Sequence, residues 1–185
     1  MSLKNLYERN TSPTFWGEEE NLDNCNCGSF ALDLTSWFAP YLEEWESTGE
    51  EDECYLGSTR DELMSSMVEY GCDAEEIMAT IIETDWQFIL EVCPWLEPIT
   101  VNDIRPEDRV IAYRLYINTD DGDDFDPDRD ADFHFRVMID GVWWEKNGAG
   151  PIHRVSEVYD GFEEEPWIIN SGLIYSGPIK YARFR

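Results

Sequence analysis

A short β-hairpin near residue 140 is the feature that most constrains how this chain can fold. Two segments, 132–139 and 142–147, flank the dipeptide Asp140-Gly141, and apolar and polar side chains alternate along the first of them. Alternation is typical of a strand with one buried face, because successive side chains of a strand point to opposite faces. Asp-Gly favours a two-residue turn in which both residues have positive φ. The sequence therefore predicts two antiparallel strands joined by a tight turn.

The register of this hairpin decides which polar side chains meet. With a two-residue turn, Arg136 lies opposite Glu145, and His134 lies opposite Asn147. All four point away from the apolar face, which is formed by Phe133, Phe135, Val137 and Ile139. Residues directly opposite are about 5 Å apart at Cβ, and Glu145 is diagonal to His134. We therefore expect a polar cluster in which either Glu145 or Asn147 orients the imidazole of His134.

Helical patterns come before the hairpin. Ser58 and Asp73 are typical helix N-caps, and Pro40 and Pro94 are typical of residues that follow a helix end. Between such signals, apolar side chains recur every three or four residues, as on the buried face of a helix. The pattern predicts helices over three segments, which are 27–39, 59–70 and 74–93.

Strand patterns dominate the second half of the chain, and beyond the hairpin they cover 110–117, 152–158 and 173–184. Helices first and strands later predict an α+β fold, with N-terminal helices packed on a mostly antiparallel β-sheet. The length suits one domain spanning residues 1–185. We expect three irregular stretches, which are an N-terminal arm (1–23), an acidic connector (43–57) and an acidic loop (119–131).

The chain is strongly acidic, with 41 acidic and 13 basic residues and a formal net charge of −28. Such a surface repels nucleic-acid phosphates and anionic membranes, and it attracts basic proteins or cations. We find no apolar run suited to a signal peptide or a membrane span, so we expect a cytoplasmic protein with reduced thiols and no membrane partner. The aspartate-rich loop lacks the spacing of an EF-hand, and we expect it to be solvated rather than to bind Ca²⁺ or Mg²⁺.

Cys27 is the candidate nucleophile, because it stands at the start of the first predicted helix. Unpaired N–H groups and the positive end of the helix dipole would lower the pKa of a thiol there, and the same N–H groups could bind an oxyanion. The alternative is a small buried cysteine that simply packs. Cys25 is a competing nucleophile but precedes the helical pattern. A zinc site built on these two cysteines would need a second close pair, which the sequence lacks.

His134 is the candidate general base. The chain has two histidines, and His153 follows Pro151-Ile152 near a strand start, where we expect a structural role. A Cys–His site also needs a third polar group that fixes the imidazole. Glu145 or Asn147 could supply it.

Two stretches of the chain resemble a known family. Asn26-Cys27-Gly28-Ser29-Phe30-Ala31-Leu32 matches an Asn-Cys-x-x-aromatic-Ala-Leu helix start. Asp132-Phe133-His134-Phe135, followed by Val142-Trp143-Trp144-Glu145-Lys146, matches an acidic-aromatic-His-aromatic strand and its return strand. This order resembles the NlpC-like and broader papain-like cysteine hydrolases, including small bacterial and prophage members. The resemblance implies a papain-like fold with Cys27 as nucleophile, His134 as base and Glu145 as orienter.

Two functions follow as hypotheses. The first is a peptidase or amidase that cleaves an amide or isopeptide bond without a cofactor. The second is a catalytically inactive acidic module that binds a basic protein, in the manner of DNA-mimicking inhibitors. The sequence does not indicate the substrate or the oligomeric state.

Overall fold

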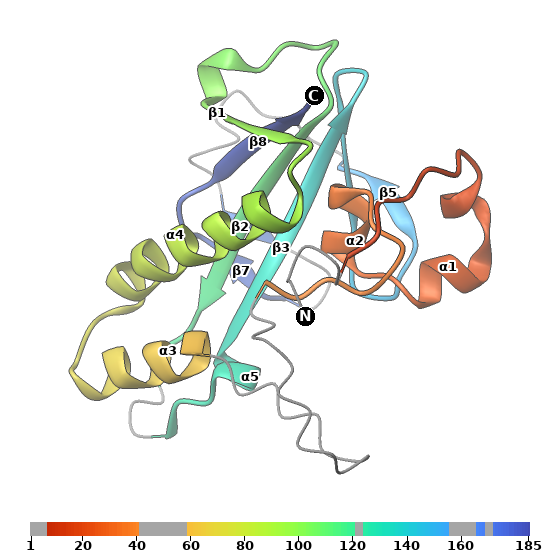
Figure 1. Cartoon of the computed structure of the whole chain (residues 1–185). Coiled ribbons are helices and arrows are strands. Elements are labelled where there is room, and N and C mark those ends of the chain that lie inside the picture. The colour runs from red at the N-terminus through yellow and green to blue at the C-terminus, as the bar shows by residue number, and fades with distance from the viewer. Residues whose placement is uncertain (1–6, 41–58, 121–123, 156–165, 169–171) are drawn as a thin grey trace.

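The computed structural model describes residues 7–40, 59–120, 124–155, 166–168 and 172–185. Its centre is a six-stranded antiparallel sheet with strand order β1-β8-β2-β3-β4-β5 (Figure 1). The strands are β1 (Leu96–Ile99), β2 (Val110–Ile117), β3 (Ala131–Ile139), β4 (Val142–Lys146), β5 (Ile152–Arg154) and β8 (Lys180–Phe184). Two further strands, β6 (Trp167–Ile168) and β7 (Ile174–Tyr175), pair with each other. The predicted mixed fold with a mostly antiparallel sheet is confirmed.

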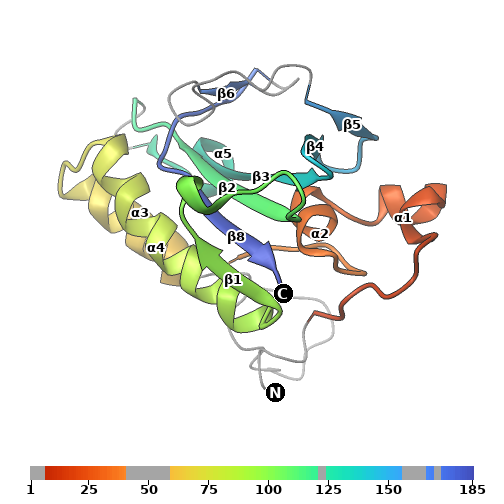
Figure 2. The same ribbon diagram turned by 90° about the horizontal axis from the view of Figure 1, so that it is seen from above.

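The helices are short except for α3 and α4. They comprise α1 (Glu19–Asp23), α2 (Cys27–Leu32), α3 (Thr59–Glu69), α4 (Ala74–Val92) and α5 (Pro127–Asp130), with 3-10 turns η2 (Phe15–Gly17) and η3 (Val101–Asp103). Seen from above, α3 and α4 lie on one side of the sheet and β6 on the other (Figure 2). Buried residues of α2 and α4 form one core cluster with β2 and β3, so these two helices cover the same face. Both faces of the central strands are therefore covered.

This double coverage explains the composition of the central strands. On β2, Ile111, Tyr113 and Leu115 face the helices, whereas Val110 and Ala112 face the β6–β7 side. Seven of the eight residues of β2 are buried. A strand buried on both faces reads as a continuous apolar run rather than as a clean alternation.

The hairpin has the predicted register. Ile139 pairs with Val142 and Arg136 with Glu145. Asp140 and Gly141 have φ values of 51° and 73°, as the two-residue turn requires. The ladder between β3 and β4 ends at the pair Arg136–Glu145, so the expected pairing of His134 with Asn147 lies beyond it.

Helix α4 is capped as expected. The side chain of Asp73 accepts a hydrogen bond from the Glu76 N–H, and the Glu76 side chain bonds back to Asp73. This reciprocal arrangement satisfies two N–H groups at the start of the helix. Helix α3 also has the expected extent and ends before Gly71 at φ 79°, whereas its expected cap Ser58 lies outside the described residues.

A buried ionic group joins these helices to the sheet. The guanidinium of Arg60 on α3 donates to the carboxylate of Asp85 on α4 at 2.9 Å. The hydroxyl of Tyr113 on β2 donates to the same carboxylate. Burial raises the pKa of Asp85, and the contacts with Arg60 and Tyr113 counteract that rise.

The helix that begins at Cys27 is much shorter than predicted. It ends at Leu32, and Asp33 follows in the left-handed region with φ 63°. The chain then folds back so that Phe38 packs on Gly28, where an added Cβ would lie 2.5 Å from the Phe38 ring. Tertiary packing against a glycine therefore ends this helix before Pro40, and Trp37 is left 51% exposed.

Two stretches expected to be irregular contain ordered structure. In the N-terminal arm, η2 and α1 form, Tyr7 is buried and Arg9 makes a β-bridge with Leu34. The acidic loop ends in α5, where Asp126 caps the helix. The acidic connector 43–57 lies outside the described residues.

The first part of the predicted strand over 152–158 is β5, which ends at Arg154. The part of the prediction from residue 156 lies outside the described residues. Strand β1 was not predicted, and it contains Pro98. It lies at an edge of the sheet, where proline is tolerated.

Candidate active site

Cys27 is the first residue of α2, as the sequence predicted. The side chain of Asn26 caps this helix by accepting from the Ser29 N–H at 3.0 Å, and Ser29 bonds back to the Asn26 N–H. Asn26 also accepts from the Phe38 N–H and donates to the Phe38 carbonyl at 2.6 Å. The returning segment and the helix start are therefore held by one carboxamide, which fixes the backbone that carries Cys27.

The expected lowering of the Cys27 pKa is wrong. The thiol is buried and donates to the Phe133 carbonyl on β3 at 3.9 Å. Burial raises its pKa to about 12, and nearby backbone N–H groups and the Lys146 charge offset this only in part. The backbone N–H groups of Phe135 and Gly28 favour a thiolate, but their effect on the pKa is smaller than that of burial. Cys27 is therefore protonated near neutral pH.

His134 lies on β3 and is almost fully buried. Its Nε2 is 3.2 Å from Glu145 Oε2 on the neighbouring strand. Burial lowers the pKa of His134, and the hydrogen bond and charge of Glu145 oppose that change. The imidazole is therefore neutral near pH 7. With Nε2–H directed at the carboxylate, the lone pair is on Nδ1 and can accept a proton.

Glu145 contacts more side chains than His134 alone, which is the one partner that was predicted for it as an orienting group. Its Oε2 also accepts from Arg136 Nε at 2.8 Å, and its Oε1 is 3.0 Å from His153 Nε2. Burial would raise the pKa of Glu145, but the His134 hydrogen bond and the Arg136 charge outweigh it and hold this pKa at about 2. The carboxylate is therefore ionised at every ordinary pH and would stabilise an imidazolium on His134.

The contact of His153 with Glu145 was not expected. His153 pairs directly with Glu145 in the β4–β5 ladder. The sequence contained a signal for a strand shortly after β4, but none for its register against β4. The register of β5 against β4 depends on the path of the connection between them, which local sequence patterns do not determine.

The alternative orienter, Asn147, does not bond to His134. Among the described residues, neither polar atom of its carboxamide has a hydrogen-bond partner, although both are buried. Glu145 is therefore the residue that orients His134 here.

Cys27 and His134 border the same hollow, whose volume is about 450 Å³. Asn26, Asn147 and Gly148 line it beside them, and its other walls come from Trp37, Asp132, Phe133, Leu173 and Tyr175. Tyr175 donates its hydroxyl to Asp132, which fixes one wall. In the described part of the chain no hydrogen bond joins Cys27 to His134, so the two groups share a hollow without being bonded at rest.

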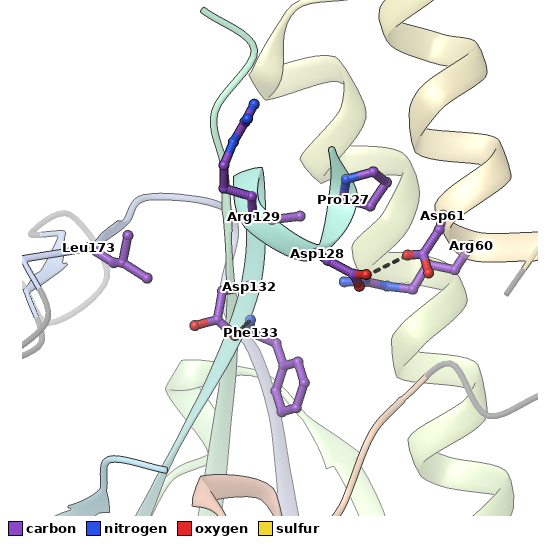
Figure 3. A pocket seen from close by; sticks show the side chains of 9 residues that line it. Arg60, Asp61, Pro127, Asp128, Arg129, Asp132, Phe133 and Leu173 are labelled. Carbon is purple, nitrogen blue, oxygen red and sulfur yellow. Dashed lines mark hydrogen bonds and ion pairs between the residues drawn. The ribbon is translucent and has the colours of Figure 1, made fainter. Parts of the chain in front are cut away.

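A second hollow of about 280 Å³ lies next to the first and shares Asp132, Phe133 and Leu173 with it (Figure 3). Its far wall comes from the start of α3, where Arg60 and Asp61 are 3.7 Å apart. The remaining wall comes from α5, through Pro127, Asp128 and Arg129. Acidic side chains from three elements, Asp61, Asp128 and Asp132, thus border this second hollow.

Comparisons with known proteins give no relative. No family model, curated protein or solved structure matches this chain.

Cys25, the competing nucleophile, is fully buried, and burial raises its pKa. It is not among the residues that line the hollow beside Cys27. Within the described residues, no group of three or more His, Cys, Asp or Glu side chains is placed to hold a metal ion. A search of the same residues for membrane spans finds no helix of sufficient length and apolar character.

Proposed function

We propose that this protein is a papain-like thiol hydrolase, a peptidase or amidase that cleaves an amide or isopeptide bond. One observation carries the proposal: Cys27 and His134 border one hollow, and Glu145 hydrogen-bonds to Nε2 of that histidine. A nucleophile, a base and a group that fixes the base are the minimum set for acyl transfer through a thiol.

The resting state is a neutral thiol and a neutral imidazole. As substrate enters the hollow, His134 Nδ1 takes the Cys27 proton while the sulfur attacks the carbonyl carbon. The new imidazolium is stabilised by Glu145, which stays ionised. His134 then gives the proton to the leaving nitrogen, the C–N bond breaks, and an acyl-thioester remains on Cys27. Water, deprotonated by His134, hydrolyses that thioester and restores the thiol. No cofactor takes part in these steps.

Iodoacetamide alkylation tests this proposal, and the chain contains its own control. Cys27 and Cys93 are both buried, and burial raises the pKa of each to about 12. They differ in surroundings, because Cys27 borders a hollow with a histidine and Cys93 packs in the core beside α4. We expect native protein to be alkylated at Cys27 and spared at Cys93, as read by peptide mass spectrometry. Equal resistance of both cysteines until unfolding would refute the proposal.

A second function is an acidic module that binds a basic protein. The net charge of −28 and the protonated, buried state of Cys27 favour it. Binding of this kind is electrostatic and falls steeply as salt rises. The protein immobilised as bait should then retain a basic DNA-binding protein at low salt and release it at moderate salt. Cys27→Ala should leave that binding unchanged, whereas the same substitution should abolish hydrolysis of an amide.

A further inference from the structure

Asn147 is an unsatisfied polar residue at the edge of the candidate active site. Its Oδ1 and Nδ2 are both buried, and neither has a hydrogen-bond partner among the described residues. The residue lines the hollow that Cys27 and His134 also border. The great majority of buried polar side-chain atoms in folded proteins are hydrogen-bonded, and an unpaired one costs free energy. A carboxamide with both of its polar atoms unpaired therefore needs an explanation.

Hydrogen bonds hold the backbone around Asn147 in a defined position. The lack of side-chain partners therefore does not result from a loosely held backbone. Lys146, which is fully buried, donates its Nζ to the Gly148 carbonyl. The Gly150 N–H donates to the Asn147 carbonyl at 2.8 Å. Gly148 takes φ 51°, which closes the turn. The backbone of Asn147 is thus held in place, whereas its carboxamide has no hydrogen-bond partner in the described part of the chain.

A second asparagine in the same hollow shows the contrast. Asn26 also borders it, and both polar atoms of its carboxamide are hydrogen-bonded, to Ser29 and Phe38. Asn26 therefore has a structural role that accounts for it. Asn147 has the same functional group and lines the same hollow, but neither polar atom of its carboxamide has a hydrogen-bond partner among the described residues.

We propose that Asn147 binds the substrate, and that its natural partner is a secondary amide lying next to the bond that Cys27 attacks. This inference rests on the proposed hydrolase function and names its substrate class, which is a peptide-like chain rather than an ester. A carboxamide offers an NH₂ donor group and a carbonyl acceptor, so it can pair with both the carbonyl and the N–H of a secondary amide. The terminal torsion of an asparagine side chain has a broad energy profile, so rotation about χ2 can turn both atoms towards the hollow.

The chemistry predicts selectivity. An ester of the same shape has a carbonyl oxygen but no N–H, so it leaves Asn147 Oδ1 buried and unpaired. Sites built to hydrogen-bond a donor discriminate against analogues that lack it. Loss of one such hydrogen bond weakens binding by roughly tenfold.

Nuclear magnetic resonance of the asparagine side-chain NH₂ groups tests the inference without needing turnover. The probes are N-methylacetamide and methyl acetate, added to the full-length ¹⁵N-labelled protein. We expect N-methylacetamide to shift the Asn147 NH₂ resonance with saturation, and methyl acetate to bind about tenfold more weakly. The Asn26 NH₂ resonance should not shift, because it is bonded within the protein. No saturable shift at Asn147, or equal binding of the two probes, would overturn the inference.

A stability measurement separates a binding role from a structural one. Asn147→Leu removes the unpaired polar atoms, so we expect its melting temperature to equal or exceed that of the wild type. A drop of several degrees would mean that the carboxamide supports the fold, and it would overturn the proposal. The outcome does not depend on catalysis: if Cys27 proves inert to alkylation while the Asn147 resonance still shifts, the hydrolase proposal fails and the amide site stands.

Discussion

Replacing Glu145 by glutamine should destabilise the protein by about 3 kcal/mol at neutral pH. The pKa of this buried carboxyl is about 2 in the folded protein, against an ordinary value of 4.5. Each unit of pKa difference corresponds to about 1.4 kcal/mol, so the folded protein favours the ionised form by about 3 kcal/mol. Glutamine resembles the protonated acid and loses this contribution. It also removes the negative charge that Arg136 Nε contacts at 2.8 Å.

The sign of the pH dependence follows from the lowered pKa. The contribution of Glu145 is fully present above pH 4.5 and is lost as pH falls through about 2. The cost of Glu145→Gln should therefore shrink from about 3 kcal/mol at pH 7 to about 1.4 kcal/mol at pH 3. Urea unfolding followed by tryptophan fluorescence at these two pH values measures the difference.

The sheet supplies a matched control for this experiment. Glu97 and Arg183 are also a cross-strand acid–arginine pair, but both are partly exposed. Exposed ion pairs contribute about 0–1 kcal/mol, so Glu97→Gln should have a small effect. The reasoning is refuted if Glu145→Gln costs less than about 1 kcal/mol at pH 7, or if its cost is the same at both pH values.

Two further substitutions test the packing around the site and the core, each with a tolerant counterpart read by thermal melting. Gly28→Ala would place a methyl group 2.5 Å from the Phe38 ring and should lower the free energy of unfolding by about 1–3 kcal/mol. In Gly17→Ala the new methyl group meets nothing within 4 Å, so the free energy of unfolding should change little. Equal melting temperatures for the two variants would contradict the packing argument. Tyr113→Phe removes a hydroxyl that donates to the buried carboxylate of Asp85 and should lower the free energy of unfolding by about 1–3 kcal/mol. Tyr70 is 88% exposed, so Tyr70→Phe should not change the free energy of unfolding. A neutral Tyr113→Phe would show that this hydrogen bond contributes no net stability.

The features that could be predicted from the sequence are those that local chemistry determines. The turn at Asp140-Gly141 and the alternation along β3 were sufficient to give the register that brings Arg136 to Glu145. The capping box at Asp73 and the glycine at 71 likewise act through neighbouring residues alone. For the same reason, the start of α2 at Cys27 was correct.

The features that could not be predicted depend on contacts distant in sequence. Helix α2 ends early because Phe38 returns to pack on Gly28, and nothing in the local pattern signals this. The raised pKa of Cys27 follows from burial against β3, more than one hundred residues away in the chain. The contact of His153 with Glu145 depends on how the chain returns from β4 to β5. In each case tertiary packing overrides an expectation drawn from neighbours.

The pH dependence of Cys27 alkylation tests the central claim, which is that His134 takes the proton from this thiol. Burial lowers the pKa of His134, so its base form predominates at neutral pH. We predict that the alkylation rate of Cys27 rises through a pKa below 6.5 and then levels off near neutral pH, and that His134→Gln removes this step. In that variant the rate should follow only the small thiolate fraction of a group whose pKa is about 12. The same pH profile in both proteins, rising with hydroxide throughout, would contradict the account.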